Sequence, residues 1–216
     1  MINEDKLKPQ PTEVKQAVYV VDDSADILDA IQVLLRSVNL NVKTFASGED
    51  FLSQADHTVR GCLLLDMRMP GMSGLDVQDA MKERGINLPV IFLTGHGEVT
   101  EAVRAMREGA LDFIEKPFQP QLLLDRIHAC LALDAQINAD QRKKKAAEER
   151  VNQLTPREYE IAKLIVAGKP SKAIGSALGI SEKTVDVHRY RIMKKVSVRS
   201  VAELVQLWLD TKQDRS

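Results

Sequence analysis

The chain has 216 residues, of which 28% are charged and 44% hydrophobic, with a formal net charge of −1 and two cysteines. This length exceeds the roughly 100 to 200 residues of a single domain, and no apolar run is long enough to span a bilayer. Residues 1–16 are polar and do not resemble a signal peptide, and Cys62 and Cys130 lack the spacing of a zinc or redox site, so we expect a cytoplasmic protein.

Four short apolar runs stand out in the first part of the chain, at residues 18–21, 62–65, 90–93 and 113–114. Apolar runs of this kind are typical of strands that are buried on both faces, as parallel strands between helices are. Polar groups at the carboxyl ends of such strands converge in one crevice, where open α/β sheets bind their ligands. The sequence therefore predicts an α/β domain with a site at that edge.

The polar residues that follow these runs predict phosphoryl chemistry. They are Asp22, Asp23, Asp66, Thr94 and Lys116, with the aromatic Phe113 beside them. Three carboxylates without His or Cys make a hard oxygen site that suits Mg²⁺, with Mn²⁺ as the alternative. A Pro/Gly turn at residues 69–74 should hold Asp66 at an accessible edge, where it could attack phosphorus and form an acyl phosphate. Lys116 and Thr94 would position the phosphoryl oxygens and neutralise their charge.

Each of these residues also has an ordinary structural interpretation. Asp23 alone could equally well be a helix N-cap. Lys116 stands before a proline, where a lysine is commonly a solvated loop residue, and Thr94 alone means little. Their order at successive strand ends, Asp-Asp, Asp, Thr and Lys-Pro, favours a joint site over the separate interpretations.

This pattern resembles the receiver domain of two-component response regulators, over roughly residues 16–133. The resemblance implies a flavodoxin-like (βα)5 fold with a five-stranded parallel sheet. It implies that Asp66 is the phosphoacceptor, Asp23 a direct metal ligand and Asp22 a ligand through water. The backbone carbonyl of Arg68 would complete the protein ligands, and Ser24 stands where many relatives carry a third acidic residue.

The same resemblance assigns the remaining residues of the site. Thr94 and Lys116 would contact the phosphoryl group, and Phe113 would be the aromatic switch that turns inward on phosphorylation. The Lys116–Pro117 bond is cis in the family, and an X-Pro bond is the one place where a cis peptide is expected.

The charge is divided unevenly along the chain. Residues 141–216 hold 17 Lys/Arg and 9 Asp/Glu, a net +8, whereas residues 1–140 hold 13 and 22, a net −9. The acidic part suits a cation and the basic part a polyanion, although a basic segment is more often only a solvated surface.

A helical linker is predicted between the two parts. Residues 121–151 contain no Gly or Pro, and apolar residues recur at helical spacing before the pattern becomes charged. We therefore expect the last receiver helix to continue into a semi-rigid linker at residues 134–152. Lys143, Lys144 and Lys145 are a solvated face of this linker or, alternatively, touch DNA phosphates. Residues 1–15 should be a disordered or extended N-terminal segment.

Residues 153–216 predict an all-α domain of four helices. The first begins with a capping box, the second covers residues 171–178, the third runs to about residue 196, and the fourth follows. The residues that mark these boundaries are Thr155, Glu158, Gly168, Gly179, Ser181 and Ser200. The second and third helices form a helix-turn-helix, with the third in the recognition position.

Helical geometry of about 100° per residue sorts the third helix into two faces. One face holds Lys183, Asp186, Val187, Tyr190 and Lys194, and we expect it, together with Thr184, to contact DNA. The lysines should bind phosphates, while Asp186, Val187 and Tyr190 are candidates for base readout. Tyr190 could instead donate to a phosphate. The opposite face holds Val185, His188, Ile192 and Val196, which favours a structural role over a DNA contact for His188.

The segment from Leu154 to Ser200 resembles the DNA-binding domain of the LuxR/NarL class, and its fusion to a receiver resembles the FixJ group. Three positions depart from the family pattern: Asp186 stands where many relatives have Lys, and on the scaffold helix Ser171 stands where Asn is more usual. Gly175 likewise replaces a more usual Ala. Phosphates would repel Asp186, but its carboxylate can accept from the amino group of cytosine, so we expect it to filter sequence without adding general affinity.

These features together predict a transcriptional regulator of a two-component system, and not an enzyme beyond the phosphorylation and dephosphorylation of its own Asp66. A sensor histidine kinase would donate the phosphoryl group, and the active form, a homodimer, would bind an inverted-repeat operator in double-stranded DNA and act as an activator. RNA polymerase is a further candidate partner. Leu204, Val205 and Trp208 are candidates for a dimer surface, although core packing would take most of them.

Two alternatives come from other classes of protein. A haloacid-dehalogenase-like phosphatase also uses a strand-end aspartate and Mg²⁺, but it normally has Asp-x-Asp, whereas Asp22 and Asp23 are adjacent. In the second alternative the chain binds DNA, and its receiver is only a structural or dimerisation module.

Overall fold

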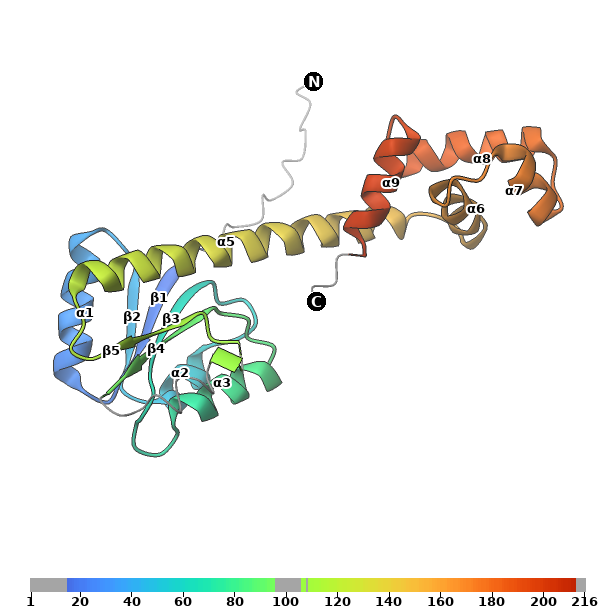
Figure 1. Cartoon of the computed structure of the whole chain (residues 1–216). Helices are drawn as coiled ribbons and strands as arrows, with labels where there is room; N and C mark the ends of the chain where they lie inside the picture. Colours follow the sequence, from blue (N-terminus) through green and yellow to red (C-terminus); the bar gives the residue numbers. More distant parts are fainter. Residues whose placement is uncertain (1–14, 96–105, 108, 213–216) are drawn as a thin grey trace, which may run out of the picture. The chain divides into compact units, whose positions relative to one another are not determined.

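The computed structural model describes residues 15–95, 106–107 and 109–212 (Figure 1). The predicted N-terminal segment therefore lies, except for Lys15, outside the described residues. The chain forms two compact units that divide between Gln136 and Ile137. Among the described helices, none is long and apolar enough to cross a membrane.

A parallel sheet forms the centre of the first unit (Figure 1). Within the described residues it has five strands, in the order β2-β1-β3-β4-β5, with every neighbouring pair parallel. The strands are β1 (Ala17–Val21), β2 (Val42–Phe45), β3 (Gly61–Asp66), β4 (Val90–Thr94) and β5 (Asp112–Glu115). This is the flavodoxin-like order, so the predicted fold class is confirmed. β2 had no clear apolar run because it is an edge strand that buries only Phe45.

Helices cover both faces of this sheet (Figure 1). One face packs against α1 (Ala25–Ser37) and α5 (Pro120–Val151), and the other against α2 (Gly48–Gln54) and α3 (Gly74–Glu83). Successive strand residues alternate between the two cores, so Val20 joins the α1 and α5 side and Val21 the α2 and α3 side. Burial on both sides explains why the strands are uninterrupted apolar runs.

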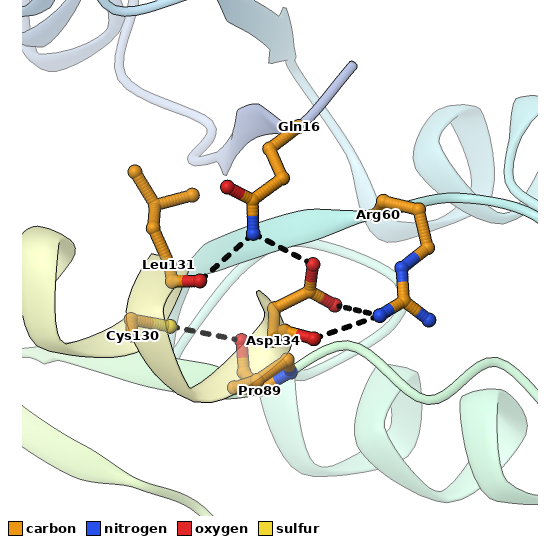
Figure 2. Close-up of polar contacts among 6 residues, drawn as sticks. All are labelled: Gln16, Arg60, Pro89, Cys130, Leu131 and Asp134. Atoms are coloured by element: carbon orange, nitrogen blue, oxygen red, sulfur yellow. Dashed lines mark hydrogen bonds and ion pairs between the residues drawn. The ribbon is translucent and has the colours of Figure 1, made fainter. Parts of the chain in front are cut away.

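A buried polar cluster fixes α5 to the amino ends of β1 and β3 (Figure 2). Gln16 donates from Nε2 to the Leu131 carbonyl and to Oδ2 of Asp134, each at 2.8 Å. Arg60 donates from Nη2 to the Asp134 carbonyl at 2.8 Å and lies 3.2 Å from Oδ1 of the same residue. Asp134 is only 1% exposed. We call Gln16, Arg60 and Asp134 the Asp134 clamp. It lies at the sheet edge opposite the carboxyl ends of the strands.

The second unit has the predicted helix-turn-helix. Its helices are α6 (Pro156–Val166), α7 (Ser171–Leu178), α8 (Glu182–Lys195) and α9 (Val201–Asp210). Thr155 and Glu158 form the predicted capping box, Ser181 and Ser200 cap α8 and α9, and Gly179 ends α7 with a left-handed φ of 65°. The prediction that the last receiver helix continues through the linker is also confirmed, because α5 is unbroken from Pro120 to Val151.

Glu158 is a buried carboxylate in this unit. Its Oε2 accepts from the Thr155 backbone N–H at 2.9 Å and from Nζ of Lys195 at 2.5 Å. The hydrogen bond from Lys195, followed by that from the Thr155 backbone, lowers the pKa of Glu158 to about 2. The capping box thus also connects the start of α6 to the end of α8.

Gly175 explains one departure from the family pattern. A Cβ atom at this position would lie 2.7 Å from the Ile180 carbonyl oxygen. In this chain α7 therefore packs closer to the helix-turn-helix turn than an alanine would allow without a backbone shift.

Replacing Asp134 with alanine should destabilise the first unit, because it leaves the Arg60 guanidinium without its carboxylate. Breaking one half of a buried ion pair costs about 3 to 5 kcal/mol. Urea unfolding followed by far-UV circular dichroism measures this loss. Asp125→Ala removes an exposed carboxylate from the same helix and should change the free energy of unfolding by no more than about 0.5 kcal/mol. Equal effects of the two substitutions would contradict a structural role for the clamp.

The Glu158 contacts should make the second unit sensitive to acid. Since its pKa lies near 2 in the folded state and at 4.5 ordinarily, the ionised carboxylate contributes stability above pH 4.5. That contribution is lost as the pH falls from 4.5 towards 2. Fluorescence of Trp208, the only tryptophan and part of this unit's core, should show wild type unfolding at higher urea than Glu158→Gln at neutral pH. The difference should shrink across the acid window, and a difference independent of pH would contradict the assignment. Glu160→Gln, an exposed change on α6, is the control.

Candidate functional site

Three carboxylates converge at the carboxyl edge of the sheet. Asp22 and Asp23 follow β1, and Asp66 is the last residue of β3. β1 and β3 are neighbours in register, with Val21 opposite Leu65, so their ends bring the three side chains together. One oxygen from each carboxylate lies within 4.8 Å of the others. The structure thus confirms that the predicted acidic residues are brought to one place.

Lys116 joins two of these carboxylates. Its Nζ lies 2.6 Å from Oδ2 of Asp22 and 2.7 Å from Oδ1 of Asp66. Burial opposes the ammonium charge, but the two hydrogen bonds outweigh burial and raise the pKa of Lys116 above its ordinary value. Burial also raises the pKa of Asp66, although Lys116 acts in the opposite direction. Lys116 therefore stays charged and holds the phosphoacceptor candidate beside the metal-ligand candidates.

The two adjacent aspartates have different surroundings. Asp22 is fully buried, and its Oδ1 accepts from the Ser24 backbone N–H at 2.9 Å. Asp23 is exposed, and the N-cap of α1 is Ser24, so the interpretation of Asp23 as a cap is wrong. The Asp23 carboxylate thus belongs to the acidic cluster and not to the helix start.

Asp66 is less accessible than the sequence predicted. Only 9% of its side chain is exposed, because Lys116 lies against it. Its backbone is also covered by α3, since a Cβ atom at Gly74 would lie 2.4 Å from the Asp66 carbonyl oxygen. The turn at residues 69–74 therefore brings a helix onto the strand end, and the expectation of an exposed edge was wrong.

The other predicted site residues lie at the same edge. Thr94 ends β4 and is buried, and its carbonyl accepts from the Lys116 backbone N–H at 2.8 Å. The Lys116–Pro117 bond is cis, as the resemblance implies. Phe113, on β5, has its side chain 45% exposed and therefore turned towards solvent. Arg68 lies two residues beyond Asp66, and the role of its carbonyl stays a prediction.

The donor set fits a hard divalent cation. Carboxylate oxygens are the ligands that Mg²⁺ prefers, and no sulfur or imidazole is in the group. When all three carboxylates are ionised, the charge of Lys116 leaves the cluster with two net negative charges, which a divalent ion would balance.

The recognition helix α8 has the predicted two faces. Val185, Ile192 and Val196 are buried in the core. The residues predicted to contact DNA are all exposed: Lys183, Thr184, Asp186, Val187, Tyr190 and Lys194. Tyr190 is 70% exposed, an unusual exposure for an aromatic side chain within an otherwise packed unit. His188 is half-buried, and its Nδ1 is buried without a hydrogen-bond partner among the described residues, which agrees with a position at the core edge.

The sequence did not predict which side chains lie beside the DNA-facing residues of α8. Lys169, Ser171 and Arg189 line a hollow of about 430 Å³ together with Asp186. Basic residues next to the recognition helix were a signal for Lys169 and Arg189. Nothing in the local pattern indicates that Ser171, on α7, contacts α8.

Comparison with known families matches both units. The model of the response regulator receiver domain matches residues 18–128. The model of the luxR family of bacterial regulatory proteins matches residues 152–208. The two matches correspond to the sheet with its acidic cluster and to the helix-turn-helix.

Several relatives match along most of their length. The transcriptional regulatory protein TdiR of Thauera aromatica is 43% identical over 188 residues, covering 87% of this chain and 83% of TdiR. The response regulator protein TodT of Pseudomonas putida is 41% identical over 190 residues, covering 88% and 84%. Nodulation protein W of Bradyrhizobium diazoefficiens is 39% identical over 193 residues, covering 89% and 85%.

Solved structures give the same result. The response regulator StyR has a TM-score of 0.82 at 41% identity, covering 90% of this chain and 98% of StyR. Full-length FixJ from B. japonicum has a TM-score of 0.58 at 33% identity, covering 94% and 100%. The family matches also favour a receiver over the phosphatase alternative. The chain belongs to the response regulators of two-component systems and combines a receiver domain with a LuxR-type helix-turn-helix for DNA binding, in the manner of FixJ.

Proposed function

We propose that Asp66 accepts a phosphoryl group from a sensor histidine kinase and that this modification controls DNA binding. The observation that carries the proposal is the contact of Lys116 with both Asp22 and Asp66. A phosphoryl group on Asp66 would add negative oxygens beside an ammonium that is already in place. Transfer forms a bond between an Asp66 carboxylate oxygen and phosphorus and breaks the bond from phosphorus to the kinase imidazole nitrogen.

The acidic cluster would hold Mg²⁺, or Mn²⁺ in its place, through Asp22, Asp23, Asp66 and the Arg68 carbonyl. The ion supplies charge neutralisation for the phosphoryl oxygens. Thr94 ends the neighbouring strand and would donate its hydroxyl to the modified Asp66. A movement of Thr94 would vacate space for Phe113, whose exposed ring would turn inward and change the receiver surface. The chain's only chemistry would be this self-modification and its hydrolysis.

The helix-turn-helix would read DNA with the exposed face of α8. Lys183 and Lys194 would bind phosphates, and Thr184 would support them at the start of the helix. Asp186, Val187 and Tyr190 would face base edges in the major groove. The protein would act in the cytoplasm, where both the kinase domain and DNA are found, as an activator that works with RNA polymerase.

The active form would be a homodimer on an inverted repeat with half-sites about one helical turn apart. Of the three candidates for a dimer surface, Leu204 and Trp208 belong to the core and are unavailable, which leaves Val205. α9 instead exposes Val201 and Leu209, with the half-buried Val205 between them at four-residue spacing. This apolar stripe is the candidate contact with a second copy.

Phosphorylation can be tested with acetyl phosphate and Mg²⁺. Intact mass should increase by one phosphoryl group, and borohydride reduction followed by peptide mapping should place it on Asp66. Asp66→Asn and removal of divalent ions should abolish labelling. Lys116→Ala should slow it by roughly 10²- to 10³-fold, since a preorganised charge is lost. Lys82→Ala, an exposed change on α3, should have no effect.

Two results would overturn this proposal. Labelling at Asp22 or Asp23 would support a phosphatase-like site. Equal DNA binding by wild type and Asp66→Asn in the presence of the phosphodonor would support a receiver with only a structural role.

The phosphate contacts of α8 predict a change in salt dependence. Lys183→Ala should weaken binding to duplexes of every sequence and reduce the slope of log affinity against log salt by about 1. Fluorescence anisotropy with a mixed-sequence duplex at several salt concentrations measures both quantities. Lys163→Ala removes an exposed lysine from α6 and should leave the slope unchanged. An equal loss of slope in both variants would argue against α8 as the DNA face.

A further inference from the structure

Two departures from the family pattern meet in one contact. Ser171, the first residue of α7, donates from Oγ to Oδ1 of Asp186 on α8 at 2.7 Å. The positions lie 15 residues apart in the chain, so the contact exists only once the helix-turn-helix has formed. Within the described residues, Ser171 is the one protein donor to Asp186, and Oδ2 is left to other partners.

The surroundings favour a carboxylate at this place. The N-cap of α7 is Pro170, which offers no side-chain hydrogen bond to the first turn. The uncompensated N–H groups of a helix start attract negative charge. Lys169 and Arg189 line the same hollow as Ser171 and Asp186. Asp186 itself is exposed, so solvent or DNA can reach it.

A fixed carboxylate on a DNA-facing surface selects among bases. It is repelled by the phosphates and is favourable only where it accepts a hydrogen bond. In the major groove, cytosine presents an amino donor, whereas guanine and thymine present acceptors, and the amino group of adenine lies beside an acceptor nitrogen. Asp186 should therefore reject three of the four bases if its oxygen is held in place.

We propose that Ser171 is a positioning residue for base readout, which holds Oδ1 of Asp186 so that Oδ2 accepts from the amino group of a cytosine. The inference rests on the DNA face of α8 proposed above. Without the hydroxyl, the Asp186 side chain has to be ordered when DNA binds, which lowers the preference for cytosine by about 2- to 10-fold. Removing the carboxylate lowers it by roughly 5- to 150-fold.

The test is selection from a pool of duplexes with a randomised central region, using the full chain with acetyl phosphate and Mg²⁺. Sequencing the bound fraction gives the base preference at each position. Wild type should select cytosine at one position of each half-site, and Asp186→Ala should lose that preference alone. Ser171→Ala should weaken it, whereas Ser171→Thr, which keeps a hydroxyl, should retain it. The double variant should match Asp186→Ala, because Ser171 acts only through Asp186.

The outcomes separate this inference from the proposed function. If wild type selects a motif that neither Asp186→Ala nor Ser171→Ala changes, only the inference fails. The inference also fails if Ser171→Ala weakens binding to all duplexes equally and lowers the free energy of unfolding, followed by Trp208 fluorescence, to a matching extent. The contact would then only join α7 to α8. If wild type enriches no sequence, the proposed DNA recognition fails as well.

Discussion

The ammonium of Lys116 between Asp22 and Asp66 is the interaction on which the receiver site depends. Carboxylates gathered within 4.8 Å repel one another unless positive charge lies among them. The Lys116 ammonium supplies one positive charge from the chain itself, and a divalent ion would balance the remaining negative charge of the carboxylates. The site therefore has its carboxylates in place before any phosphoryl group arrives, and the free energy of organising them is provided by folding rather than by transfer.

The two units divide the charge of the chain between them. The receiver gathers acidic groups at one sheet edge, whereas the helix-turn-helix exposes lysines on α8. The proposed modification of Asp66 would add negative charge to the acidic unit, whereas the proposed DNA contacts belong to the basic one.

The sequence predicted what depends on local pattern and fold class. Strand ends, helix caps and the faces of α8 follow from periodicity, so the sequence predicts the strand end at Asp66, the N-cap at Thr155 and the exposed face that carries Tyr190. Contacts between distant residues could not be predicted in this way. Lys116 lies 50 residues further along the chain and covers Asp66, so the predicted exposure of Asp66 was wrong. Ser171 and Asp186 are separate departures in the sequence, and only the fold joins them.

The Asp134 clamp decides where this chain can be divided for experiments. A receiver fragment ending at residue 133 keeps the whole acidic site but removes the carboxylate that Arg60 and Gln16 bind at the opposite edge. Such a fragment would carry a largely buried guanidinium with no counter-charge from α5, and its low solubility or altered activity could be mistaken for a property of the receiver. A boundary at Gln136 or later keeps the Asp134 clamp, the strand starts and the phosphoacceptor candidate in one piece.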